Sequence, residues 1–144
     1  MSMYDAICAL ETACANKTGG PAVVQVTPQD KEDLRPGKAC NSWLNLTPVK
    51  TDRKDETGGS YIADYMIKMS LWIAKPVKTN GKAMLKVAAD VWGVVMTSVR
   101  TGHLGGYSRL DISPGQIQEK WESGDDGDIA YTIRAEIVVQ KQEA

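Results

Sequence analysis

The residues that could carry out catalysis or bind metal are few and scattered along the chain. His103 is the only histidine, and the three cysteines are Cys8, Cys14 and Cys40. Because the chain has one histidine, a metal site with several histidine ligands is excluded and a Ser–His–Asp triad is improbable on composition. The cysteines form no CxxC pair, which argues against zinc, and an odd number of thiols fits a reducing compartment. We therefore expect no metal, no cofactor and no enzymatic activity.

Three further stretches have partial similarity to ligand-binding motifs. Thr18-Gly19-Gly20-Pro21 and Thr57-Gly58-Gly59-Ser60 lack the GxxxxGK[ST] pattern of a phosphate loop, so we interpret both as turns. The acidic stretch from Ser123 to Asp128 lacks the glutamate that ends a calcium loop, which favours a solvated turn. Glu119 and Glu122 could form a carboxylate pair, but no partner group accompanies them.

The composition is that of an ordinary globular domain. The chain has 144 residues, with 17 basic and 18 acidic side chains and a net charge of −1. This balance gives no electrostatic drive towards nucleic acid, so no specific nucleic-acid binding is expected. No apolar run approaches the roughly 18 residues that cross a bilayer, and the first residues do not have the pattern of a signal peptide. We expect one domain over residues 1–144, made in the cytoplasm, with no membrane partner.

Two segments have the hydrophobic spacing of helices. The first spans about residues 4 to 16, where Ser2 followed by Asp5 fits a capping box. The second spans residues 81 to 100, and Asn80 can cap it. Its apolar stripe consists of Met84, Leu85, Ala88, Val91, Trp92, Val95, Met96 and Val99.

Period-two alternation predicts the strands. It is clearest over residues 61–73 and 129–140, where every second residue is apolar. Shorter strands are predicted at 22–26, 39–49 and 107–112 and around 117–121. Because the amphipathic surfaces need mutual burial, we expect an α+β fold: a mainly antiparallel sheet flanked by a long central helix and a short N-terminal helix.

Two regions are candidate interfaces. Residues 50–59 are densely charged and end in a glycine pair, which predicts an exposed, mobile hairpin tip. The second face of the strand over 61–73 carries Asp64, Lys68 and Ser70 and is interrupted by Ile62 and by the two large residues Met66 and Trp72. The same chain or another subunit could cover them, and tryptophan is enriched at interface hot spots. The candidate interface residues are Asp52, Arg53, Lys54, Asp55, Glu56, Met66 and Trp72.

The predicted elements form a plan that covers most of the chain. A short N-terminal helix at 5–15 is followed by a hairpin with its charged tip at 52–56 and by a central helix at 82–100. A Gly-Asp-rich turn then leads into the strand Ile129-Ala130-Tyr131-Thr132-Ile133-Arg134-Ala135-Glu136-Ile137-Val138-Val139-Gln140. This plan resembles that of the tail terminator, or tail completion, proteins of long-tailed bacteriophages. These small proteins cap the tail tube and join it to the head side.

The resemblance implies an α+β fold, no catalysis and a ring, usually a hexamer, whose central hole continues the tube. It also implies the tail tube protein and neck or head-completion proteins as partners. The location would be the tail of the virion, after synthesis in the host cytoplasm. Other neck or tail tube structural proteins share a similar plan and remain an alternative. A small-molecule binding module or a small hydrolase that uses carboxylates is the alternative from a different class.

Overall fold

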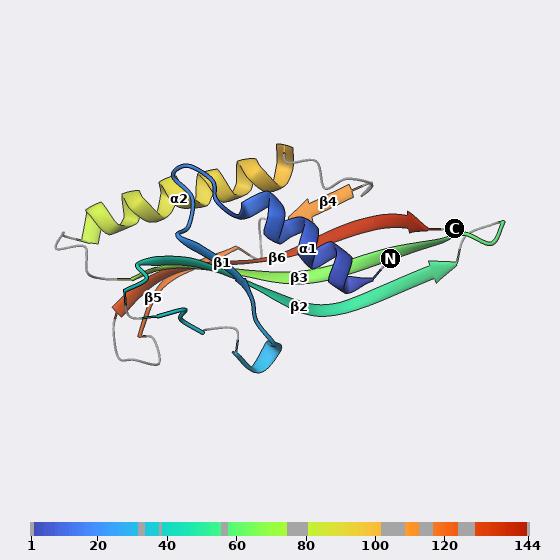
Figure 1. The fold of residues 1–144 in the computed structure, drawn as a ribbon, viewed down its shortest axis with the longest axis horizontal. Coiled ribbons are helices and arrows are strands. Elements are labelled where there is room, and N and C mark those ends of the chain that lie inside the picture. Colours follow the sequence, from blue (N-terminus) through green and yellow to red (C-terminus); the bar gives the residue numbers. More distant parts are fainter. Residues whose placement is uncertain are drawn as a thin grey trace.

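The computed structural model describes residues 2–31, 34–37, 39–55, 58–74, 81–101, 109–112, 117–123 and 129–143. Two helices, α1 (Met3–Cys14) and α2 (Gly81–Thr101), lie on one side of a long twisted sheet (Figure 1). We call this side the helix face. A short 3-10 turn, η1 (Gln29–Lys31), lies on the other side of the sheet, which we call the opposite face.

The sheet has six strands in the order β1-β2-β3-β6-β4, and β5 also pairs with β6. β1 runs parallel to β2, and every other pair is antiparallel. β5 pairs with the first half of β6 and β4 with its second half, so both lie along the same side of β6. The expected mainly antiparallel sheet is confirmed. The strands are β1 (Val23–Val26), β2 (Ser42–Asp55), β3 (Tyr61–Ala74), β4 (Arg109–Ile112), β5 (Gln118–Ser123) and β6 (Ile129–Glu143).

The main core lies between the helix face and the two helices. Alternate residues of β3 from Ala63 to Ile73 are fully or almost fully buried there, as the period-two pattern predicts. The Ser2–Asp5 capping box starts α1, and the Ser2 amide donates to the Asp5 carboxylate over 2.8 Å. Burying each large aliphatic side chain in such a core stabilises the fold by about 1.5–3 kcal/mol.

The buried stripe of α2 is narrower than the predicted one. Met84, Val95 and Val99 are buried as expected, but Trp92 is only half-buried. The apolar stripe predicted from the sequence includes Leu85, but this side chain is 41% exposed, so the prediction is wrong for Leu85. Consecutive residues lie about 100° apart around a helix, and Leu85 therefore turns away from the sheet when Met84 packs onto it.

The charged segment from Lys50 belongs to the sheet for most of its length. The strand predicted over 39–49 is longer in the structure and continues to Asp55, because β2 pairs with β3 through this residue. The pairing overrides the low strand propensity of charged residues by giving each backbone group a partner. The exposure of the segment is confirmed, since residues 52–55 are all exposed. A register shift between Pro48 and Lys50 bends β2 where proline cannot donate a ladder hydrogen bond.

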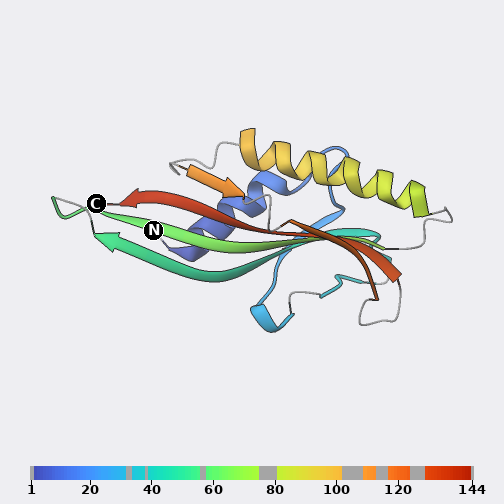
Figure 2. The same cartoon turned by 180° about the vertical axis from the view of Figure 1, so that it is seen from behind.

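Both chain ends lie towards the β2–β3 hairpin end of the sheet, as the front and back views show (Figures 1 and 2). Several positions discussed above lie outside the described residues. They are Glu56, Thr57, Asn80, His103, Asp125, Asp126 and Asp128.

Candidate assembly interface

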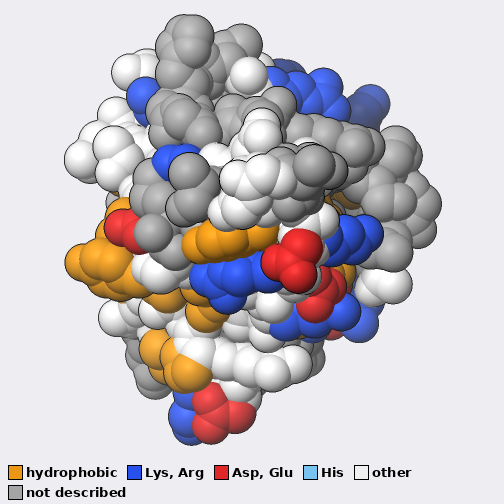
Figure 3. Space-filling view, turned by 90° about the vertical axis from the view of Figure 1, so that its right-hand side faces the viewer, with side chains coloured by type: hydrophobic (Ala, Val, Ile, Leu, Met, Phe, Trp, Pro, Cys, Tyr) orange, Lys and Arg blue, Asp and Glu red, His pale blue; other side chains and the backbone are white. Residues whose placement is uncertain are grey.

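The hairpin end carries charges of both signs. Lys50 and Asp52 form an ion pair of 3.4 Å, and the guanidinium of Arg53 lies 5.9 Å from the centre of the Tyr61 ring. Figure 3 views the molecule from this end and shows acidic and basic side chains next to each other. Exposed ion pairs contribute at most about 1 kcal/mol, so a partner can replace them at little cost. The exposed Lys54 and Asp55 extend the same charged surface.

Met66 lies on the opposite face of the sheet. It is half-buried, between Lys50 of β2 and Val138 of β6 in the strand register. Asp64, two residues earlier on the same face, accepts a 2.8 Å hydrogen bond from Gln140. The Met66 side chain is therefore partly accessible on a surface that combines polar side chains with the apolar Val138.

Trp72, by contrast, is covered by its own chain and is only 2% exposed. Its ring stacks on that of Trp43, with 5.7 Å between centroids and an interplanar angle of 5°. Arg35 lies 5.2 Å from the Trp43 centroid and Arg134 lies 5.3 Å from the Trp72 centroid. The result is a layered Arg–Trp–Trp–Arg stack on the opposite face. The sequence left open whether the same chain or another subunit covers Trp72. The structure shows that the same chain covers it, so Trp72 offers almost no surface to a partner.

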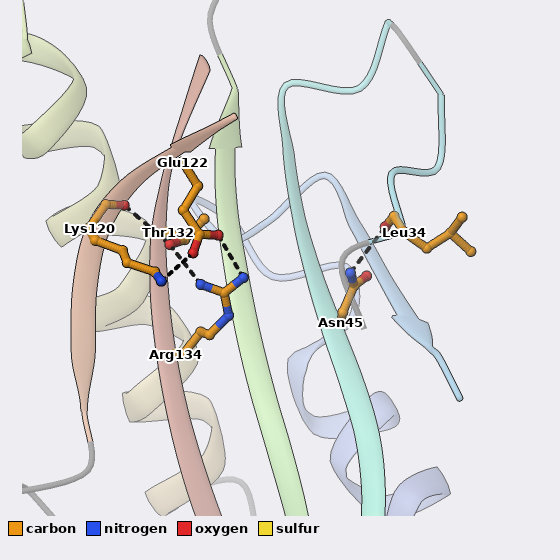
Figure 4. A network of polar contacts seen from close by, with 6 residues as sticks. All are labelled: Leu34, Asn45, Lys120, Glu122, Thr132 and Arg134. Atoms are coloured by element: carbon orange, nitrogen blue, oxygen red, sulfur yellow. Dashed lines mark hydrogen bonds and ion pairs between the residues drawn. The ribbon is translucent and has the colours of Figure 1, made fainter. Parts of the chain in front are cut away.

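A polar network of Lys120, Glu122 and Thr132 surrounds the guanidinium of Arg134 (Figure 4). This guanidinium donates to Glu122 over 2.6 Å and to the hydroxyl of Thr132 over 3.2 Å. Glu122 also pairs with Lys120 over 2.7 Å. Burial opposes ionisation of Glu122, but the hydrogen bonds from Arg134 and Lys120 outweigh burial and lower its pKa. The carboxylate thus stays charged and holds the arginine in place.

The other end of the stack is held by the loop that follows η1. The carbonyl of Leu34 accepts hydrogen bonds from Asn45 over 3.0 Å and from Gln25 over 2.9 Å. Arg35 donates to the carbonyl of Cys40 over 3.0 Å. These contacts fasten the loop across β1 and β2 and cover Trp43.

Among the described residues, three buried polar atoms of the opposite face have no hydrogen-bond partner: Nε1 of Trp43, Nε1 of Trp72 and Oγ of Ser70. Leaving a buried donor unpaired costs about 1–3 kcal/mol. The stack is therefore stabilised by packing and by its arginines, at the expense of two unpaired indole N–H groups.

The sheet ends in two different edges, one at β1 and the other at β4 and β5. The amide of Thr27 donates to the carbonyl of Leu46 over 2.9 Å. Backbone direction alternates along a strand, so the backbone groups of Val24 and Val26 point away from β2, towards the free edge of β1. Within the described part of the chain, no strand lies beyond β1, β4 or β5.

Two features near these edges were not predicted from the sequence. Trp121 of β5 is 45% exposed, although it is among the most hydrophobic residues of the chain. A groove of about 530 Å³ lies beside β1 and is lined by residues of α1 and β1. The sequence of β5 is short and alternates only weakly, which is typical of an edge strand. This feature could have indicated that Trp121 is exposed.

Neither a metal site nor a membrane span is found among the described residues. No group of three or more His, Cys, Asp or Glu side chains in that part of the chain could hold a metal ion. Neither helix is long and apolar enough to cross a membrane. No protein-family model and no curated protein matches the sequence.

Proposed function

We propose that this chain is a structural subunit that acts by assembly: a tail terminator that caps a phage tail tube as a ring, most simply of six copies, and links the tube to neck proteins. The observation that carries the proposal is the pair of unlike sheet edges, beside which the described part of the chain places no further strand. A contact between two different surfaces of each copy repeats from copy to copy and closes into a ring when the rotation between copies is a whole fraction of a turn, whereas a two-fold contact stops at a dimer.

The strand directions support this kind of contact. β1 runs parallel to β2, β2 and β6 are both antiparallel to β3, and β5 is antiparallel to β6. β1 and β5 of one chain therefore run in opposite directions. When a rotated copy brings its β5 edge beside β1, the new pair is antiparallel, which is the commoner arrangement in sheets.

The hairpin end supports a second contact, with the tail tube or the neck. It extends the sheet as β2 and β3, and its exposed side chains carry both signs of charge. Mixed charges of this kind favour specific, salt-sensitive docking more than tight burial. Lys54 and Asp55 are the accessible charges with which to test it.

The decisive experiment uses the phage that encodes the chain. Deleting the gene should give tails of irregular length or tails that fail to join heads, and adding the purified protein to such tails should restore joining. Electron microscopy should show a closed ring at the end of each capped tail. Normal virions from the deletion strain would refute the proposal.

A charge-reversal series locates the docking surface. The double variant Lys54→Glu, Asp55→Lys should bind tails more weakly while its thermal unfolding stays unchanged. The matched control is the charge swap Lys86→Glu, Asp90→Lys on α2, where the two side chains are 79% and 65% exposed and pair with each other at the surface. Equal loss of tail binding in both variants would point to a general charge effect and not to the hairpin.

Another neck or tail tube protein is the alternative within the same class. Such a protein would polymerise into open-ended tubes or bind elsewhere in the neck, so microscopy of the purified protein distinguishes it from a terminator that stops at one ring.

A further inference from the structure

An exposed tryptophan marks the β5 edge. Trp121 stands directly opposite Tyr131 in the β5–β6 register, and Tyr131 belongs to the core beneath the helices. Paired residues of antiparallel strands share a face, so Trp121 lies on the helix face. Its ring meets that of Tyr131 edge-on, with 5.0 Å between centroids. The neighbouring Ile129 is 51% exposed, so the two form an apolar surface at one end of the sheet.

A groove marks the β1 edge on the same face. It has a volume of about 530 Å³ and runs between the C-terminal half of α1 and the start of β1. Val26 continues the apolar edge of β1 and is 42% exposed. The groove is open, and its exposed lining is mainly polar, with a carboxylate and a hydroxyl beside small and apolar side chains. Its lining residues are Glu11, Thr12, Ala15, Asn16, Ala22, Val23 and Val24.

Both features lie at the same level of the sheet. The register runs from Val24 through Leu44 and Leu71 to Ile133 and then to Glu119 of β5. A cyclic assembly relates its copies by rotation without a shift along the axis. Features at one level on opposite edges are therefore the ones that a rotation brings together, and β4, which pairs further along β6, is not at this level.

We propose that Trp121 of one copy inserts into the groove between α1 and β1 of the next copy, while β5 of the first copy pairs with the free edge of β1. This inference rests on the ring assembly proposed above and names its contact. The outward-facing backbone groups of Val24 and Val26 supply the strand pairing. Glu11 and Thr12 offer acceptors for the indole N–H of the inserted ring, and a buried tryptophan in a pocket is the typical anchor of an interface.

Two variants block opposite sides of the contact. Trp121→Ala removes the inserted ring, and Thr12→Arg fills the groove from the exposed side of α1. Each should weaken self-association by at least about 30-fold in sedimentation velocity, the effect of losing an interface anchor. Thr12→Ser is the control for the groove and should associate like the wild type. Thermal unfolding of each variant checks that the fold is retained.

Mixing the two blocked variants tests the direction of the contact. Thr12→Arg keeps an intact tryptophan, and Trp121→Ala keeps an intact groove. Each alone should be monomeric, and an equimolar mixture should give a one-to-one heterodimer that grows no further. A two-fold contact through β1 alone would instead leave Trp121→Ala self-associating as well as the wild type, which would overturn the proposal.

A proline at the β1 edge tests the strand pairing. Val26→Pro removes an amide that points away from β2, so the fold should persist while association is lost. Val26→Ala trims the side chain and keeps the amide, and it should still associate. Association of Val26→Pro at the wild-type level would overturn the pairing.

A wild-type protein that stays monomeric at about 1 mM would overturn the whole contact. It would leave the terminator proposal standing, because that proposal is tested on tails. If the Trp121→Ala variant caps tails as well as the wild type does, the Trp121–groove contact is refuted. The proposed tail terminator function is not.

Discussion

Replacing Trp72 tests how the opposite face of the sheet is held together. The side chain is 2% exposed and lies between Trp43 and Arg134. Truncating a buried tryptophan to alanine costs about 3–5 kcal/mol, a value that includes the lost transfer free energy and the cavity left behind. We expect Trp72→Ala to fall in the upper half of this range, because it also removes the ring stacking with Trp43 and the guanidinium contact.

Trp72→Phe should behave very differently. Phenylalanine keeps an aromatic ring in the stack but carries no N–H group. The Nε1 of Trp72 is buried and meets no acceptor within the described part of the chain, and an unpaired buried donor costs about 1–3 kcal/mol. Removing it offsets most of the cavity term left by the smaller ring, so we expect a net loss of less than about 1.5 kcal/mol, well below that of Trp72→Ala.

Urea unfolding measures both changes as shifts of the midpoint at an unchanged slope. Trp121→Phe is a suitable control, because Trp121 is 45% exposed and its replacement should cost little. A loss for Trp72→Phe close to that for Trp72→Ala would refute the reasoning. It would mean that the indole N–H has a partner, such as a buried water, and that the stack depends on it.

Three further predictions concern single side chains. Glu122→Gln should destabilise the protein by about 1–2 kcal/mol at neutral pH. The pKa of Glu122 is lowered in the fold, so its contribution is present above its unfolded pKa and is lost as the pH falls through the folded value. The difference from the wild type in urea titrations should therefore shrink below about pH 4.3. Ser2→Ala removes the capping box of α1 and should cost about 1 kcal/mol, whereas Ser2→Asp should cost much less, as circular dichroism melts would show. Burial raises the pKa of the Cys14 thiol to about 11, so mass spectrometry of native protein treated with iodoacetamide near pH 8 should find Cys14 the last of the cysteines to be labelled.

Local patterns were enough to predict most of the elements. The alternation of Tyr61 to Ile73 and of Ile129 to Gln140 appears as β3 and β6, which pair along almost their whole length. Ser2 and Asp5 are three residues apart and form the predicted cap of α1. Such features depend on neighbours in the sequence or on a simple period, so the sequence itself determines them.

The charged part of β2 shows where local patterns fail. Its composition is typical of a loop, yet β2 continues to Asp55 because β3 lies opposite and supplies hydrogen bonds residue by residue. Strand pairing is a long-range property, and it can override the weak local preference of lysine, arginine and aspartate.

The two tryptophans Trp72 and Trp121 show what only the tertiary structure decided. Both occur in strands, and the sequence gives no rule that buries one and exposes the other. Trp72 is buried because β3 is central and Trp43 of β2 and Arg134 of β6 close over its ring. Trp121 is half-exposed because β5 is an edge strand with no described neighbour on its outer side. The sequence determined most of the strands and their apolar faces, while strand pairing decided how far β2 extends and which aromatic ring is enclosed or left at an edge.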